Sequence, residues 1–214
     1  MSVIAPCITV ETAEAFKASV ERLQPFATRV HIDTSDGEFA PTFLLGADQM
    51  YWPQNWQVDI HAMVARPSEQ LDRLIALKPN LIIFHAEIQE DRAALVAKIK
   101  AAGIKAGIAL LRPTVPSTVA DIIRLVDHVM IFSGDLGHYG GNASLIQLEK
   151  VRLVKALNPA VEIGWDGGVS LDNAYTLTQG GVDVLNSGGA IANAENPAGM
   201  YEALTKEINK RGVI

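Results

Sequence analysis

The sequence predicts an α/β protein built as a single (β/α)8 barrel, the TIM barrel architecture, over residues 1–214. Three observations favour this fold. Eight short apolar runs rich in β-branched residues recur along the chain, helical patterns separate most of them, and the repeat of roughly 25 residues is near the lower size limit of such barrels. An open doubly wound sheet is the competitor, but no G-x-G-x-x-G sequence follows the first run.

The eight predicted strands are short and apolar, as expected of strands buried on both faces of a parallel sheet. They occupy residues 3–5, 30–32, 58–60, 81–84, 106–109, 129–132, 161–163 and 182–185. The spacing of apolar residues predicts helices over residues 13–23, 71–77, 91–101, 119–125, 145–157, 171–178 and 197–208. Asp91 and Asn196 are expected N-caps, and Gly103 and Gly180 are expected helix ends. Residues 35–55 carry only weak helix or strand signals.

The chain is acidic, with a formal net charge of −6 and no cluster of Lys or Arg. This balance argues against nucleic acid or an anionic membrane as a partner. The one cysteine, Cys7, excludes an intrachain disulfide. No apolar run is as long as a membrane span and the N-terminus lacks a signal-peptide pattern, so we expect a cytoplasmic protein.

Side chains that bind metals fall where three predicted strands end, at the functional end of such a barrel. His31 and Asp33 alternate onto one face of the second strand, His61 lies on the third, and Asp166 follows the seventh. Each has a simpler explanation by itself, His61 as a hydrogen-bonded core histidine and Asp166 as a turn residue before two glycines. Together, two imidazoles and two carboxylates suit zinc, iron, manganese or cobalt.

Paired glycines follow three of the last predicted strands. They are Gly140 and Gly141 after the sixth strand, Gly167 and Gly168 after the seventh, and Gly188 and Gly189 after the eighth. Barrels often bind phosphate with the loops after strands seven and eight, through backbone N–H groups that glycine lets a ligand approach. Tight turns are the simpler explanation, but the positions of the pairs favour a phosphate site.

At these residues the chain resembles the ribulose-phosphate 3-epimerase family, nearly from end to end. The most distinctive block is HIDTSDGEFAPT at residues 31–42, which is similar to the family's His-x-Asp-x-x-Asp-Gly-x-Phe-x-Pro signature. Further blocks follow in the family's order, namely IAPCI at 4–8, DIHAMV at 59–64, FHAE at 84–87, WDGGV at 165–169 and SGGAI at 187–191.

The resemblance implies that His31, Asp33, His61 and Asp166 bind one divalent metal, with zinc the first choice. It also implies that Asp33 and Asp166 are an acid/base pair, one on each face of the substrate, and that the glycine pairs bind phosphate. Met63 matches a methionine that packs around the reacting carbon. The implied activity is C3 epimerisation of a small phosphorylated ketose, D-ribulose 5-phosphate to D-xylulose 5-phosphate, in a homo-oligomer.

The chain departs from the family at three places. Thr9 lies near the position of a first-strand serine, and Ser35 replaces a usual methionine. Residues 133–142, SGDLGHYGGN, replace the usual Asn-Pro-Gly-Phe-Gly-Gly-Gln loop and add His138 and Tyr139. We treat Thr9, Ser35, Met63 and His138 as candidate substrate contacts, with closure of His138 and Tyr139 over substrate left open.

Two other functions stay open. The changed loop and the more polar Ser35 favour the same chemistry on another ketose phosphate, such as a hexulose 6-phosphate. A catalytically silent sugar-phosphate binding barrel is the alternative from a different class, although such a protein has no need of the second aspartate. A decarboxylase of the orotidine-phosphate type is disfavoured, because DTSD at residues 33–36 lacks the lysine of an Asp-x-Lys-x-x-Asp motif.

Overall fold

The strands form one closed parallel barrel in chain order, in a computed structural model that describes residues 2–138 and 140–210. They are β1 (Val3–Ile8), β2 (Arg29–Ser35), β3 (Gln57–Met63), β4 (Leu81–His85), β5 (Lys105–Leu110), β6 (His128–Phe132), β7 (Glu162–Asp166) and β8 (Val184–Ser187). β1 pairs with both β2 and β8, which closes the ring. The predicted (β/α)8 fold is confirmed.

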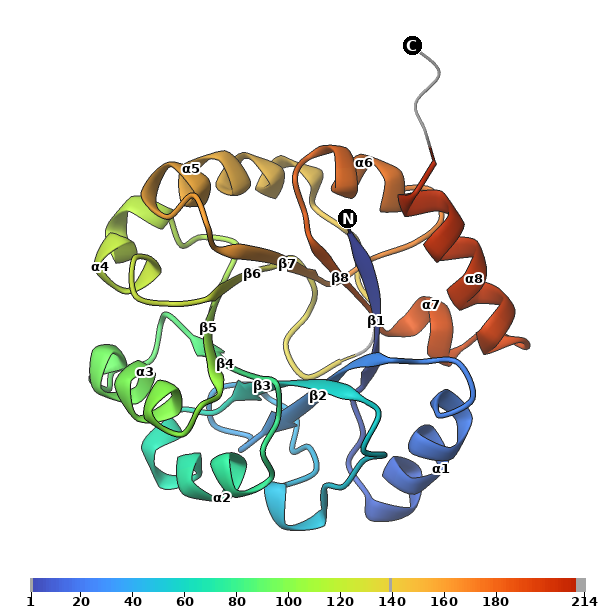
Figure 1. The fold of residues 1–214 in the computed structure, drawn as a ribbon, viewed down its shortest axis with the longest axis horizontal. Coiled ribbons are helices and arrows are strands. Elements are labelled where there is room, and N and C mark those ends of the chain that lie inside the picture. Colours follow the sequence, from blue (N-terminus) through green and yellow to red (C-terminus); the bar gives the residue numbers. More distant parts are fainter. Residues whose placement is uncertain (1, 139, 211–214) are drawn as a thin grey trace.

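Helices cover the outside of this ring, as Figure 1 shows. They are α1 (Ala13–Leu23), α2 (Leu71–Ala76), α3 (Arg92–Ala101), α4 (Ala120–Ile123), α5 (Glu149–Leu157), α6 (Ala174–Gln179), α7 (Gly189–Ala192) and α8 (Pro197–Ile208). The side chains of Asp91 and Asn196 cap α3 and α8 as predicted, by accepting backbone N–H groups of the first turn. Short 3₁₀ turns, Pro116–Val119 and Leu145–Leu148, precede α4 and α5.

β8 begins at Val184 rather than at residue 182, where the apolar run begins. The backbone N–H of Val182 donates to the Leu177 carbonyl at 3.2 Å, so Val182 closes the turn after α6 before the strand starts. The strand also runs to Ser187, two residues past its predicted end, so Asn186 lies within β8, opposite Asp166 of β7 in the strand register. A polar residue therefore lies on the inner wall of the barrel beside a predicted catalytic residue.

Alternation along each strand divides the barrel wall into an outer apolar face and an inner face. On β2, Val30 and Ile32 belong to the main apolar core that joins the strands to the helices. His31 and Asp33 alternate with them and face the barrel interior. The same alternation on neighbouring strands gathers polar side chains along the axis, where the fold requires each to find a partner.

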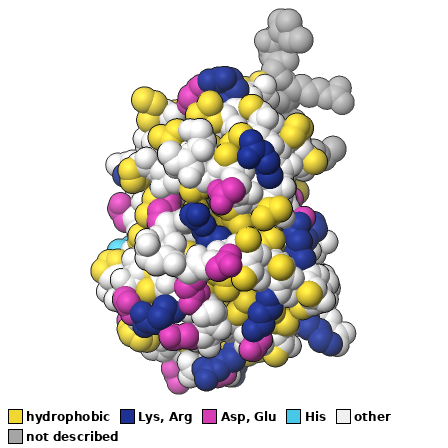
Figure 2. Space-filling model, turned by 90° about the vertical axis from the view of Figure 1, so that its left-hand side faces the viewer, with side chains coloured by type: hydrophobic (Ala, Val, Ile, Leu, Met, Phe, Trp, Pro, Cys, Tyr) yellow, Lys and Arg dark blue, Asp and Glu magenta, His cyan; other side chains and the backbone are white. Residues whose placement is uncertain are grey.

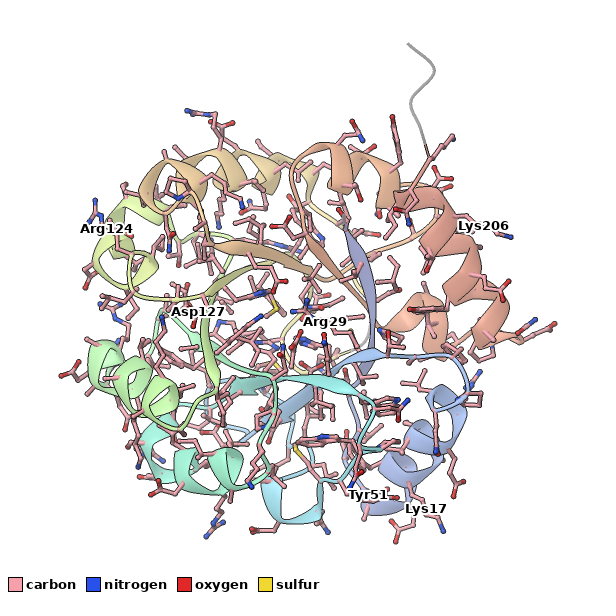
Figure 3. All side chains as sticks on the ribbon, in the orientation of Figure 1. Lys17, Arg29, Tyr51, Arg124, Asp127 and Lys206 are labelled. Carbon is pink, nitrogen blue, oxygen red and sulfur yellow. The ribbon has the colours of Figure 1, made fainter. Side chains whose placement is uncertain are left out.

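Ion pairs fill the N-terminal end of the barrel interior. Arg29 donates from Nε to Asp59 Oδ2 at 2.6 Å, and from its two terminal nitrogens to the Glu162 carboxylate at 2.9 and 2.8 Å. Figure 3 labels Arg29 near the middle of the ring of strands. Burial alone raises the pKa of Glu162, but hydrogen bonds from Arg29 and His128 hold it well below its usual range. This neutralised end is typical of the stabilising face of a barrel, which leaves the opposite end for chemistry.

The outer surface carries charges of both signs. On the face in Figure 2, Lys and Arg side chains are interspersed with Asp and Glu, and no field of one sign stands out. Lys98 pairs with Asp72 at 2.6 Å and Lys100 with Asp127 at 2.9 Å. Across the part of the chain that the structure describes, every helix is too short or too polar to cross a bilayer.

Candidate metal and substrate site

Four ligand-type side chains meet at the C-terminal end of the barrel interior. His31 and Asp33 come from β2, His61 comes from β3, and Asp166 is the last residue of β7. Each of the four side chains offers one ligand atom, and these four atoms all lie within 4.8 Å of one another. Asp33 and His61 are register partners on adjacent strands, so their side chains emerge side by side. The structure therefore brings all four predicted ligands together.

The contacts within this cluster fit a divalent metal. His61 Nδ1 lies 2.9 Å from Asp33 Oδ1 and 3.8 Å from Asp166 Oδ2, and His31 Nε2 lies 3.3 and 3.8 Å from the same two oxygens. Both ring nitrogens of His31 are buried and lack a hydrogen-bond partner among the described residues. Buried polar atoms without a partner are costly and rare, and a metal ligand explains this one. Two imidazoles and two carboxylates are a donor set that zinc and its neighbours accept.

The two carboxylates of the cluster differ in protonation. Burial raises the pKa of Asp166 to about 7, with nearby His31 opposing the rise and Asp33 adding to it. Burial acts the same way on Asp33, but contacts with His31 and His61 outweigh it and hold the Asp33 pKa well below its usual range. Burial also lowers the pKa of His61 to about 4. Near neutral pH the pair thus holds one charged carboxylate and one that retains a proton part of the time.

A cavity of about 490 Å³ opens over the cluster. Its walls come from the loops after β6, β7 and β8, and the first of these, in yellow, passes across the middle of the ring in Figure 1. Among the described residues, the lining includes Asp33, Asp135 and Asp166 but no Lys or Arg. A phosphorylated ligand in such an acidic cavity needs backbone N–H donors and a compensating cation.

The predicted phosphate-binding glycines all line this cavity; they are Gly140, Gly141, Gly167, Gly168, Gly188 and Gly189. Gly167 and Gly168 have positive φ angles of 101° and 72°. A Cβ on Gly167 would lie 2.0 Å from the Gly134 nitrogen, and one on Gly168 would lie 2.1 Å from the Ala143 nitrogen. The loop after β6 therefore rests directly on the loop after β7, and this packing alone requires glycine at both positions.

Three of the candidate substrate contacts reach the cavity, namely Thr9, Met63 and His138. Thr9 Oγ1 donates to Asp33 Oδ2 at 2.5 Å, so it orients one carboxylate of the cluster. His138 Nε2 lies 3.2 Å from Thr42 Oγ1, which ties the loop after β6 to the loop after β2.

Ser35 does not reach the cavity in the part of the chain that the structure describes. It is buried, and its Oγ accepts the Gly37 N–H at 3.4 Å. The Ser35 hydroxyl therefore makes its hydrogen bond within the loop after β2, and the geometry does not support a contact between Ser35 and substrate. Tyr139 lies outside the described residues.

Three residues near the site carried no predicted role. His85 and Glu87 stand behind His61, with His85 Nε2 only 2.8 Å from His61 Nε2. Asn186 lines the cavity, is 2% exposed, and has an Oδ1 without a hydrogen-bond partner among the described residues. The sequence carried a signal for each. His85 and Glu87 share one strand face by spacing, and Asn186 interrupts an apolar run.

The fold and site define a closed (β/α)8 barrel with a His/Asp cluster suited to a divalent metal and a glycine-lined cavity above it. A family model described as the ribulose-phosphate 3 epimerase family matches residues 3–192. The chain belongs to this family, and the family is one of isomerases.

Named relatives agree with this assignment, and a solved structure agrees with the fold. A chloroplastic ribulose-5-phosphate-3-epimerase of Arabidopsis thaliana is 29% identical over 79% of this chain, although the match spans only 63% of that relative's length. A ribulose-phosphate 3-epimerase of Helicobacter pylori is 30% identical over 82% of this chain and 84% of its own. The crystal structure of 3-hexulose-6-phosphate synthase from Salmonella typhimurium matches with a TM-score of 0.74 at 14% identity, covering 97% of this chain and 99% of that one, which shows the fold.

Proposed function

We propose that this protein is a divalent-metal-dependent 3-epimerase that interconverts D-ribulose 5-phosphate and D-xylulose 5-phosphate. The observation that carries the proposal is the pair Asp33 and Asp166, which share one buried cluster with two imidazoles yet differ in protonation. Family membership supports the reaction class, and the names of the relatives supply the pentulose phosphate as the first substrate to test.

Epimerisation beside a ketone requires one group to remove a proton from one face of the carbon and another to return a proton to the opposite face. Asp33, held as a carboxylate by its histidine contacts, fits the base in one direction. Asp166, whose burial favours the protonated form, fits the acid, and the two exchange roles in the reverse direction. Thr9 holds Asp33 in place for this exchange through its hydrogen bond to Oδ2.

A divalent metal held by His31, Asp33, His61 and Asp166 would stabilise the negative charge that develops on the ketone oxygen when the proton leaves. We take zinc as the first candidate because two imidazoles are present, with iron, manganese and cobalt as alternatives. Elemental analysis of the purified protein, followed by reconstitution with each ion, tests the choice. The homo-oligomeric state and the cytoplasmic location stay predictions, and light scattering tests the first.

The backbone N–H groups of the glycine pairs are the proposed phosphate contacts. Because the cavity lining among the described residues has no basic side chain, these donors would carry the recognition of phosphate. Binding the phosphate at one end of the cavity holds the reacting carbon over the carboxylate pair, which saves the entropy of orienting it. Met63 lines the same cavity and would exclude water from the reacting carbon.

Exchange of the C3 proton with solvent deuterium tests the proposal, with NMR as the readout on metal-replete and metal-stripped protein. We expect metal-dependent deuterium incorporation into D-ribulose 5-phosphate together with formation of D-xylulose 5-phosphate. Well-folded, metal-replete protein that exchanges no ketose phosphate would be a silent binding barrel, and the enzyme assignment would be wrong.

A hexulose 6-phosphate is the second substrate to test, because Asp135 and His138 line the cavity from the loop that differs from the family's pattern. These polar side chains offer partners to hydroxyl groups of a longer sugar. If kcat/KM is at least tenfold higher for the hexulose 6-phosphate than for D-ribulose 5-phosphate, the hexulose 6-phosphate becomes the assigned substrate.

Asp33→Asn and Asp166→Asn are each expected to abolish turnover while the fold is retained, because each removes a base and perturbs a metal ligand. Asp172→Asn is the matched control, since Asp172 is an exposed aspartate after β7 and outside the cavity lining. Near-wild-type kcat in either cluster variant would refute the two-base assignment.

A further inference from the structure

A line of polar side chains extends from the cluster to the far side of β4. His61 turns Nδ1 toward Asp33 Oδ1 at 2.9 Å and Nε2 toward His85 Nε2 at 2.8 Å. Both imidazole rings are fully buried. His85 Nδ1 then lies 3.4 Å from Glu87 Oε2, just past the end of β4. The cluster is therefore connected to a third carboxylate, Glu87, that does not touch it.

Two ring nitrogens at 2.8 Å share one proton, so one is the donor and the other the acceptor. If His61 carries that proton on Nε2, its Nδ1 keeps a lone pair directed at the cluster, and His85 carries its proton on Nδ1. If His85 carries the shared proton on Nε2, then His61 is protonated on Nδ1 and cannot bind a metal there. Full burial favours neutral rings and limits them to these two arrangements.

Glu87 favours the first arrangement. Its Oε1 accepts the Leu111 N–H at 2.9 Å and the Thr114 hydroxyl, which fixes the carboxylate in place. Its Oε2 lies 3.4 Å from His85 Nδ1, and neither atom has a hydrogen-bond partner among the described residues. A carboxylate at this position can accept a hydrogen bond from Nδ1–H but repels a lone pair, so it favours His85 protonated on Nδ1.

We infer that Glu87, acting through His85, holds His61 in the tautomer that presents the Nδ1 lone pair to a divalent metal. Glu87 and His85 are then positioning residues of the metal site, and neither touches metal or substrate. Asp33 competes from the other side, because a carboxylate 2.9 Å from His61 Nδ1 favours a proton on that atom in the metal-free protein. The inference rests on the metal site proposed above.

Zinc affinity, measured by competition with a chelating dye, gives the first test. Outer partners of ligating histidines typically contribute 10–100-fold to metal affinity, and we expect about this loss in Glu87→Met, which keeps the size of the side chain but has no strong acceptor. Glu87→Gln is expected to lose affinity too, because its oxygen would accept from Leu111 and Thr114 while its NH2 group would face His85 Nδ1 as a donor. Thr114→Val is the matched control, because it removes an anchor of Glu87 and leaves the His85 contact in place.

Nitrogen-15 NMR of histidine in the metal-free proteins gives the second test, because it distinguishes the two tautomers directly. Because Asp33 competes for a proton on His61 Nδ1, we expect a larger population of His85 protonated on Nδ1 in the wild type than in Glu87→Met. Unchanged zinc affinity in Glu87→Met, equal populations of the His85 tautomers in both proteins, or an equal loss in Thr114→Val would each overturn the inference. Wild-type protein that binds no divalent metal would overturn the proposed function as well, so the two failures are distinguishable.

Discussion

Binding of zinc to the cluster is expected to release protons from the protein below neutral pH. Burial raises the pKa of Asp166 to about 7, so this carboxyl is mostly protonated at pH 6 and mostly ionised at pH 8 when no metal is bound. His31, whose pKa is raised by its contact with Asp33 against the effect of burial, adds part of a second proton. Asp33 and His61 contribute none, because their pKa values lie below this range.

The sign follows from mass action, since metal competes with these protons. Zinc affinity should rise with pH, by about tenfold per pH unit for each proton displaced, and level off above the pKa of Asp166. More protons should leave at pH 6 than at pH 8, because Asp166 loses its proton between these two values. The magnitude depends on the burial of Asp166 and on its distance from the charge of Asp33.

Titration calorimetry at pH 6 in two buffers with different ionisation enthalpies measures the proton count. Asp166→Asn is the informative variant, because it removes the carboxyl that holds most of the proton and should lower the release by about one. Release of no protons at pH 6 from protein that binds zinc would refute the reasoning. Asp166 would then be ionised before metal binds, and burial would not govern its pKa.

Four further variants test packing and specificity. Gly164→Ala should destabilise the protein by about 1–3 kcal/mol in thermal unfolding, because the new Cβ would lie 2.4 Å from buried His128 Nε2. Gly46→Ala is the control: its new Cβ would have no atom within 4 Å, so the same assay should show neutral or slightly raised stability. Asn186→Leu should lower kcat/KM by about 3–10-fold without loss of stability, through loss of a polar contact to substrate; equal kcat/KM would remove Asn186 from the site. Gly189→Asp should raise KM strongly by placing charge near the phosphate, and an unchanged KM would exclude Gly189 from phosphate binding.

The barrel was predictable because its strands are short apolar runs with β-branched residues, and because a closed parallel barrel allows few connections. Element ends were harder to predict. Val182 is as apolar as the strand that follows, yet it bonds back to Leu177, and hydrophobicity alone does not separate a turn closure from a strand start. Residues 35–55 gave weak helix and strand signals because hydrogen bonds with side chains, which leave no periodic pattern in the sequence, hold this segment in place. Asp36 accepts the N–H groups of Glu38, Phe39 and Ala65.

The candidate cluster was predictable from alternation on β2 and β3 together with the position of Asp166, since these rules place side chains on one end of a barrel. The supporting residues were not, because their roles depend on contacts between strands. FHAE places His85 and Glu87 on one face, but only the register of β3 and β4 shows that His85 lies behind His61. Packing of Gly137 against Thr42 joins loops far apart in sequence, which no local pattern predicts.

The acidic side chains are balanced differently at the two ends of the barrel interior, and this contrast supports a bound cation at the C-terminal end. At the N-terminal end, Arg29 neutralises Asp59 and Glu162 within the protein. At the C-terminal end, Asp33 and Asp166 converge with no basic side chain other than histidine in the cluster, as far as the described residues show. A protein that needed only stability there would gain by pairing or replacing these carboxylates. Two carboxylates without Lys or Arg, beside a buried His31 whose ring nitrogens lack a hydrogen-bond partner among the described residues, are the arrangement expected of a site that binds a divalent metal.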